Sequence, residues 1–245
     1  MFNGFTAVLY REFTVYRKRF FKQLLTASLS PLLFLIAFGW GLGREVSVGG
    51  MPYINFLIPG LVTMSSLNQS FAISAEINIS RFYFHTFDEY LIAPASHLEI
   101  VLGEALFGVF RGMLSCLIIF LYVVVFKVKL SFNAMFLPAI LLHTFQFSAL
   151  AVTTSMVVKD HSSQALVNNF VITPMIFLCG TFFPLGKLPS AFNYLVSILP
   201  LTYSTKAIRA SLTGGTVEYS HLSIMGLFCL VFFITSMLAL RRVEA

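Results

Sequence analysis

Long, mostly apolar runs with few charged residues recur along this chain and decide its organisation. A helix needs about 20 such residues to cross the hydrocarbon core of a bilayer. Runs of that length predict spans at about 24–43, 54–77, 133–158, 162–183 and 222–240. Another run, at about 100–126, is interrupted by Glu104 and Arg111. The pattern therefore predicts an all-α integral membrane protein with six transmembrane helices in a single domain, 1–245.

A further uncharged run, 188–205, contains two prolines and several polar residues. If it crossed the bilayer, the basic residues before the first span and the Arg241–Arg242 pair would lie on opposite sides. Basic residues near span ends favour the cytoplasmic side, so both termini are expected in the cytoplasm. We expect residues 184–215 to form a re-entrant or interfacial hairpin on the outer face, where non-helical backbone needs protein or water around it.

Residues 3–22 are predicted to form an amphipathic interfacial helix. Apolar residues recur at intervals of three or four along one stripe, and basic residues lie opposite. The stripe consists of Phe5, Leu9, Phe13, Tyr16 and Phe20, and the basic side of Arg11, Arg17, Lys18 and Lys22. Such a helix lies at the headgroup boundary with its cations on anionic lipid. Membrane lipid is therefore an expected partner.

The longest loop expected on the inner side contains a short amphipathic piece, 84–94. Its apolar residues are Phe87, Tyr90 and Leu91, its acidic residues are Asp88 and Glu89, and Pro94 closes it. The apolar residues can share one helical face while the acidic ones point elsewhere. Exposed apolar residues on a short helix favour docking to a soluble partner. The alternative is a helix lying on the membrane, although acidic residues suit an anionic inner leaflet poorly.

Composition excludes a soluble domain. Hydrophobic residues make up 58% of the chain and charged residues only 11%, whereas soluble domains carry about 25% charged residues. The net charge of +6 arises largely from the basic residues placed just before the first span. That placement is typical of membrane topology signals and not of DNA binding. We therefore expect no nucleic-acid partner.

Motifs for catalysis and for nucleotide binding are missing from the sequence. A phosphate loop needs four residues between its glycines and a Ser or Thr after its lysine. Gly180 and Gly186 have five residues between them, and Leu188 follows Lys187. HExxH and GxSxG motifs are absent, and the cysteines and histidines are scattered. We expect no catalytic site, no metal site and no cofactor in this chain.

Polar residues inside the predicted spans are the remaining candidates, because each is costly in lipid and tends to face a partner or an aqueous path. They are Asn68, Gln69, Glu76, Glu104, Arg111, Asn168 and Asn169. Glu104 and Arg111 share a helix face two turns apart, too far for an easy direct pair. Each is therefore expected to meet a neighbouring span or a second copy of the chain. The amides are candidates to line a translocation route, and hydrogen bonds between helices are an equal alternative.

Several segments, taken in order and spacing, resemble the ABC-2 type exporter permeases, particularly the branch with daunorubicin-resistance and nodulation-factor permeases. Besides the basic amphipathic start, they are FLIPGL at 56–61, FDEYLIAPAS at 87–96, GTFFP at 180–184 and LP at 188–189. One departure is Leu199–Pro200, where relatives often have Asn-Pro. The resemblance covers almost the whole chain.

The resemblance implies the type V ABC exporter fold in the bacterial inner membrane. It implies that two copies of the chain form the pathway and that each docks a separate ATPase subunit, which binds ATP and Mg. The 84–94 piece then becomes the coupling helix, with Phe87, Asp88, Glu89, Tyr90, Leu91 and Pro94 at the ATPase. The substrate is expected to be amphipathic or lipid-linked. The alternatives are an integral membrane enzyme that modifies lipids, and a passive channel or scaffold.

Overall fold

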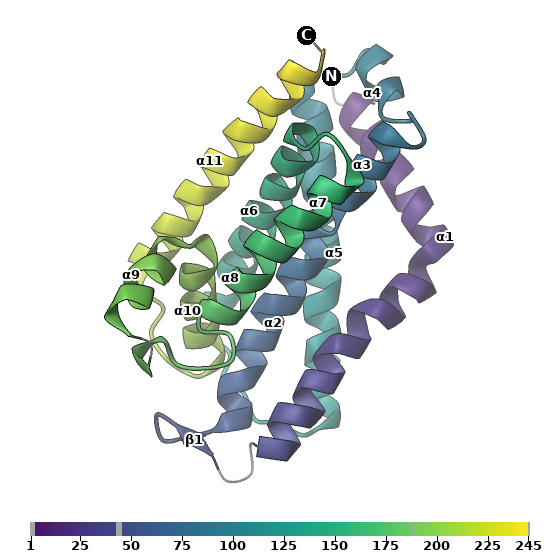
Figure 1. Ribbon diagram of the computed structural model, residues 1–245. Coiled ribbons are helices and arrows are strands. Elements are labelled where there is room, and N and C mark those ends of the chain that lie inside the picture. Colours follow the sequence, from purple (N-terminus) through teal and green to yellow (C-terminus); the bar gives the residue numbers. More distant parts are fainter. Residues whose placement is uncertain (1–2, 43–45, 188, 245) are drawn as a thin grey trace.

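The computed structural model describes residues 3–42, 46–187 and 189–244 and is almost entirely helical (Figure 1). Its first half comprises α1 (Asn3–Phe34), the π-helical η1 (Leu35–Leu42), β1 (Ser47–Val48), β2 (Met51–Pro52), α2 (Tyr53–Phe71), α3 (Ile73–Phe82), α4 (Asp88–Ile92) and α5 (His97–Val125). Its second half comprises α6 (Phe136–Val157), α7 (His161–Val167), the π-helical η2 (Asn168–Ile172), α8 (Thr173–Leu178), the 3-10 turn η3 (Leu185–Lys187), α9 (Ser190–Ile198), α10 (Pro200–Leu212) and α11 (Tyr219–Glu244).

Five helical segments of the described chain are long and apolar enough to cross a membrane. They are Gly4–Gly39, Tyr53–Phe82, His97–Val125, Phe136–Val157 and Tyr219–Val243. They correspond to the spans predicted at 24–43, 54–77, 100–126, 133–158 and 222–240. The span predicted at 162–183 corresponds to a helical stretch, His161–Leu178, whose π-helical middle is η2, and it is not among those five. The chain is thus a multi-pass helical membrane protein.

The first helix differs from the prediction of a separate amphipathic helix at 3–22 followed by a span at 24–43. A single helix, α1, runs from Asn3 to Phe34 and continues into η1. Residues 5–30 contain neither Gly nor Pro, so nothing in the local sequence ends the helix between the two predicted parts. Figure 1 shows α1 bending about midway, so that its two halves run in different directions.

The predicted coupling helix, 84–94, is shorter in the structure and covers only Asp88–Ile92. His85 before it has a positive φ of 52°, a conformation that helices do not contain. Ala93 after it is extended (ψ 152°), as expected for a residue that precedes proline. Both ends of the helix are therefore set by the local backbone. The preceding span, α2 with α3, reaches Phe82 instead of residue 77.

The central helix is α6, which packs against α2, α3, α5, α10 and α11. Its buried polar residues bond outward to these neighbours: His143 Nε2 lies 3.0 Å from the carbonyl oxygen of Thr63 in α2. Gln146 Nε2 donates to Ser204 Oγ of α10 at 2.6 Å. Close contact depends on small residues, because a Cβ on Gly108 would lie 2.0 Å from Ser148 Oγ. The interior of the bundle is therefore partly polar and tightly packed.

The two ends of the molecule carry different elements. The start of α1, the end of α11 and α4 lie at one end, and the β1–β2 hairpin lies at the other (Figure 1). We call these the inner and outer ends. The predicted hairpin at 184–215 consists of two short helices, α9 and α10, joined by the extended residue Leu199.

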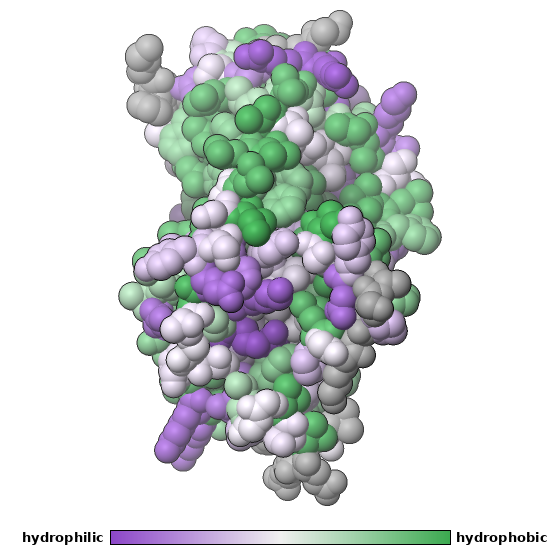
Figure 2. All heavy atoms as spheres, turned by 90° about the vertical axis from the view of Figure 1, so that its left-hand side faces the viewer, coloured by the Kyte–Doolittle hydropathy of each residue, from purple (hydrophilic) through white to green (hydrophobic). Residues whose placement is uncertain are grey.

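The surface on the α11 side has the polarity expected of a lipid-facing helix. Figure 2 shows hydrophobic side chains gathered between a hydrophilic inner end and a hydrophilic zone at the level of α9. The exposed apolar residues of α11 include Leu227, Leu230, Val231, Ile234 and Leu238. At its inner end α11 closes with the exposed Arg241 and Arg242.

Candidate functional site

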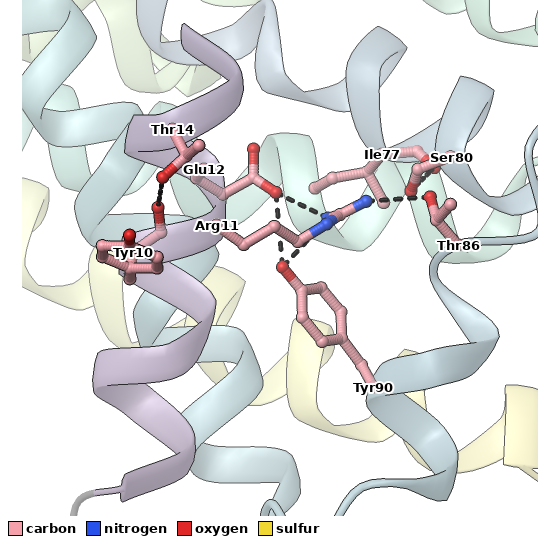
Figure 3. A network of polar contacts seen from close by, with 8 residues as sticks. All are labelled: Tyr10, Arg11, Glu12, Thr14, Ile77, Ser80, Thr86 and Tyr90. Atoms are coloured by element: carbon pink, nitrogen blue, oxygen red, sulfur yellow. Dashed lines mark hydrogen bonds and ion pairs between the residues drawn. The ribbon is translucent and has the colours of Figure 1, made fainter. Parts of the chain in front are cut away.

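The inner loop that carries α4 is held against α1 by one arginine. Arg11 Nη1 donates to Glu12 Oε1 at 2.7 Å and to Tyr90 Oη at 2.9 Å, and Nη2 donates to Thr86 Oγ1 at 2.8 Å (Figure 3). The guanidinium carbon also lies 4.9 Å from the centre of the Tyr90 ring. Tyr90 Oη in turn donates to Glu12 Oε1 at 3.3 Å. These contacts connect residues about 75 positions apart and tie the loop to α1.

The phenol of Tyr90 is suited to this donor role. Burial, followed by the negative charges of Glu104 and Glu12, raises the pKa of Tyr90 well above its ordinary value. The hydroxyl therefore keeps its proton and can donate to Glu12 throughout the physiological range. The prediction took Tyr90 for a residue that contacts a partner, whereas here it contacts the chain's own first helix.

Burial on α4 is opposite to the expected exposure of its apolar residues. Phe87 is fully buried and Tyr90 nearly so, with their rings edge to face at 5.4 Å. Asp88, Glu89 and Pro94 are exposed. The side chain of Leu91 lies outside the part that the structure describes. The expectation that Phe87 and Tyr90 are exposed is therefore wrong, because this face of the loop packs against the helices of the same chain.

The outward surface of the loop is formed by other residues. Ile92, which directly follows Leu91, is 86% exposed, and Asp88 and Glu89 lie beside it on α4. Phe82, Tyr83 and Phe84 before α4 are exposed as well. We call Asp88, Glu89 and Ile92 the outward face of α4. It combines two carboxylates with one large apolar side chain.

Arg111 forms an ion pair between helices and does not pair with Glu104. Its Nη1 donates to Glu76 Oε1 of α3 at 2.6 Å, and its Nη2 donates to Gln69 Oε1 of α2 at 3.3 Å. Gln23 Nε2 of α1 donates to the same Glu76 oxygen at 3.2 Å. The expectation that Arg111 meets a neighbouring span is confirmed. Three of the predicted polar residues, Gln69, Glu76 and Arg111, thus form one cluster with α1.

A cavity of about 330 Å³ lies beside this cluster, between α1, α3, α5 and the segment before α4. Its polar lining includes Arg11, Glu12, Arg19, Gln23, Glu76 and Glu104. Glu104 is only 2% exposed. Within residues 3–42, 46–187 and 189–244 no hydrogen bond reaches the Glu104 carboxylate. The charged groups that act on it, Glu12 and Arg11 of α1 and Glu76 of α3, belong to neighbouring helices, as expected.

The predicted asparagines lie on another side of the molecule. Asn68 and Asn168 line one cavity of about 440 Å³ between α2, α3 and α7, together with His161 and Gln164. Asn169 is exposed and does not belong to this lining. The amides expected along one route therefore lie in different places: Gln69 is in the inner charged cluster, whereas Asn68 and Asn168 line this cavity.

At the outer end, two segments with family-like sequence meet each other. A Cβ on Gly60, in the 56–61 segment, would lie 2.1 Å from the carbonyl oxygen of Thr181, in the 180–184 segment. Tyr53 Oη donates to the carbonyl oxygen of Phe182 at 2.9 Å. Only glycine allows so close an approach of α2 to this turn. We call this contact, with Arg209 described next, the outer junction.

Arg209 of α10 completes the outer junction. Its Nη2 donates to the carbonyl oxygens of Gly180 at 2.7 Å and Thr181 at 3.3 Å. Its guanidinium carbon lies 3.9 Å from the centre of the Phe56 ring. The sequence singled out neither Arg209 nor Glu12 as a site residue. Glu12 did carry a signal, since it is the acidic residue in an otherwise basic helix.

Comparisons with known proteins show which family this chain is similar to. The sequence profile of the ABC-2 type transporter family matches residues 3–213. The chain is 30% identical to nodulation protein J of Rhizobium meliloti, over 98% of this chain and 95% of that protein. It is 28% identical to nodulation protein J of Sinorhizobium fredii, over 96% and 92% of the two chains. It is also 28% identical to the inner membrane transport permease YadH of Escherichia coli, over 76% and 73%.

Proposed function

Because the chain belongs to the ABC-2 type transporter family, we propose that it is the permease of an exporter whose ATP-hydrolysing subunit is a separate protein. Two copies form the translocation pathway, and each binds one ATPase subunit that carries ATP and Mg. ATP-driven closure of the ATPases moves the spans and releases an amphipathic or lipid-linked substrate from the cytoplasm or the inner leaflet. The chain itself hydrolyses no ATP.

The observation that carries this proposal is the contrast between the two sides of α4. Inward, the loop is fixed to α1 by the Arg11 contacts and by the burial of Phe87 and Tyr90. Outward, it presents Asp88, Glu89 and the exposed Ile92. A loop that transmits force needs a firm attachment on one side and a free docking surface on the other. The outward face of α4 is therefore the proposed contact with the ATPase.

The proposed topology has six crossings, with His161–Leu178 as the fifth. The start of α1 and the end of α11 lie at the same end of the molecule, which an even number of crossings requires (Figure 1). That end carries the basic residues of α1 together with Arg241 and Arg242, and cytoplasmic ends are rich in Lys and Arg. We place this end and α4 in the cytoplasm and α9–α10 at the outer surface of the bacterial inner membrane.

The proposed pathway lies on the side of α2 and α7. Asn68 and Asn168 are exposed there, inside a stretch that would otherwise face lipid. Exposed amides at membrane depth favour an aqueous path or a protein partner. A second copy of the chain placed against this side would enclose them. Asn68 and Asn168 are the residues proposed to line the route.

The proposal is tested by exchanging residues on the outward face of α4. The variants Glu89→Lys and Ile92→Asp are expected to insert into the membrane normally but to lose co-purification with an ATP-binding subunit and to lose export. Glu218→Lys, an exposed carboxylate before α11 at the other end, is the matched control and should keep both. If a protein carrying both substitutions still exported at an unchanged rate, the loop would be excluded as the docking site. Substrate turnover by the purified chain alone would favour an enzyme instead.

A further inference from the structure

Three carboxylates line the cavity beside α1, those of Glu12, Glu76 and Glu104, and one of them has no direct partner. Glu12 is paired with Arg11 at 2.7 Å, and Glu76 is paired with Arg111 at 2.6 Å. Both cations are therefore already engaged. Glu104 lines the same cavity without a hydrogen bond from the described residues and is nearly fully buried.

A buried carboxylate without a partner is unfavourable, because it has lost its hydration and gained nothing in return. Along the axis of α5, Glu104 lies about 10 Å from the first residue of the helix, at a rise of about 1.5 Å per residue. Glu104 is one of the residues that line the cavity of about 330 Å³. Gln23 lines the same cavity, and its Oε1 is buried without a donor. These two acceptors therefore have no donor, because Arg11, which lines the same cavity, is engaged with Glu12, Tyr90 and Thr86.

A positively charged side chain lines the cavity closer to the surface of the protein. Arg19 lines the cavity, is exposed, and is not within ion-pair distance of a carboxylate in the described residues. Beside it, Val15 is 45% exposed and Phe84 66% exposed. The opening therefore combines one cation with apolar surface. It belongs to the amphipathic part of α1, which suits the boundary between headgroups and acyl chains.

This distribution of charge matches one kind of molecule. An ammonium group with N–H donors fits the acceptors around Glu104, and a phosphate fits Arg19 at the opening. Acyl chains then lie over Val15 and Phe84. These three parts, in this order, make up a phospholipid with a primary amine in its headgroup.

We propose that this cavity binds the headgroup of a zwitterionic aminophospholipid from the surrounding leaflet, with its ammonium at Glu104 and its phosphate at Arg19. The bound lipid would lie between α1 and α3 and beside the residues that fix α4. A metal ion is a poorer occupant, because the described residues contain no group of three His, Cys, Asp or Glu side chains placed to hold one. The proposal is independent of which substrate is exported.

The test uses the purified full chain in detergent with lipids that differ only in the headgroup. Native mass spectrometry would compare retention of phosphatidylethanolamine, its N-acetylated derivative, phosphatidylcholine and phosphatidylglycerol. We expect phosphatidylethanolamine to be retained about tenfold more strongly than the other three, which is about 1.4 kcal/mol. N-acetylation removes the ammonium and leaves the phosphate and acyl chains unchanged.

Two variants locate the site on the protein. Glu104→Gln keeps the shape of the side chain and is expected to abolish the preference for the primary amine. Arg19→Gln is expected to weaken retention of all phospholipids at this site while the order among them persists. Glu218→Gln, an exposed carboxylate far from the cavity, is the matched control and should behave like the unchanged protein.

Three results would overturn the proposal. The first is equal retention of all headgroups by the unchanged protein, which would leave a proton on Glu104 as the simpler account. The second is an unaltered preference in Glu104→Gln. The third is full competition by soluble glycerophosphoethanolamine at the same concentration, which would point to a free headgroup and not to a membrane lipid. The ligand series needs no variant, so a poorly folded Glu104→Gln protein does not decide the outcome.

Discussion

The loop attachment at the inner end and the junction at the outer end hold the same bundle together in different ways. At the inner end, Arg11 binds side chains, namely those of Glu12, Thr86 and Tyr90. At the outer end, Arg209 binds the backbone carbonyls of Gly180 and Thr181. Side chains can change rotamer and release their partner, whereas a carbonyl moves only with the backbone. The inner attachment is therefore suited to adjustment, and the outer junction to a fixed geometry.

The largest expected effect comes from filling the contact between α2 and the 180–184 turn. Gly60→Val places side-chain atoms where the carbonyl oxygen of Thr181 lies, since a Cβ alone would be 2.1 Å from it. Such overpacking should destabilise the protein by about 3 kcal/mol. Thermal unfolding in detergent measures this. Gly226→Ala in α11, where a Cβ meets nothing within 4 Å, is the control and should be neutral or slightly stabilising.

The next effect in size is expected from Arg209→Met. Loss of the guanidinium leaves the carbonyls of Gly180 and Thr181 without their donor, at a cost of about 2 kcal/mol. The free energy of unfolding should fall, and limited proteolysis should become faster at 180–186. Lys206→Met, an exposed cation one turn earlier on α10, should change neither quantity. Equal behaviour of the two variants would contradict the junction as described.

A smaller effect on stability is expected at the inner end. Arg11→Met removes the donors to Thr86 and Tyr90, but the two hydrogen bonds are only partly buried, so the cost should be about 1 kcal/mol. Amide hydrogen exchange in residues 83–96 should nevertheless speed up while the rest of the chain keeps its protection. The exposed Arg17→Met serves as the control. If the exchange of 83–96 did not respond, Arg11 would not be what holds the loop.

The smallest effect concerns pH and is expected at the start of α7, in the loop that follows α6. Hydrogen bonds from the backbone and hydroxyl of Ser163, the backbone bond being 2.7 Å, lower the pKa of Asp160. Because the pKa of Asp160 is lower in the folded protein, its hydrogen bonds with Ser163 stabilise the fold fully above the ordinary pKa of the carboxyl, near 4. This stabilisation is lost as the pH falls through the lower pKa of the folded state. Exchange protection of α7 should therefore decline only in acid. Asp160→Ala should be independent of pH in that window, and a parallel decline would refute the capping role.

Much of the fold follows from local sequence, because the length and polarity of a run decide whether it can cross a bilayer. The five long segments were predicted to within a few residues at most ends. The division of α1 into two helices was wrong, since a change from amphipathic to apolar does not by itself break a helix. Local sequence reports which residues share a face but not what covers that face.

The candidate site was less predictable for the same reason. The segment containing Phe87 and Tyr90 was identified, yet its apolar face is covered by the chain itself. The partner of Arg111 was expected on another helix, but its identity as Glu76 depends on how α3 and α5 align in space. Arg209 was not predicted, because from sequence alone a basic residue near an outer loop is counted only toward the orientation of the spans. Its role depends on the carbonyl groups that it binds, which the fold brings to it.

The polar residues of α6 have a consequence for how the protein is made. A helix that leaves the translocon alone meets lipid on every side, and His143 and Gln146 would then be without partners. The carbonyl of Thr63 is already available when α6 is synthesised, because α2 precedes it in the chain. Ser204 is not, because α10 is made later. Insertion of α6 is therefore completed only when α10 reaches the membrane, so a nascent chain that stops before α10 should be held by the insertion machinery or degraded.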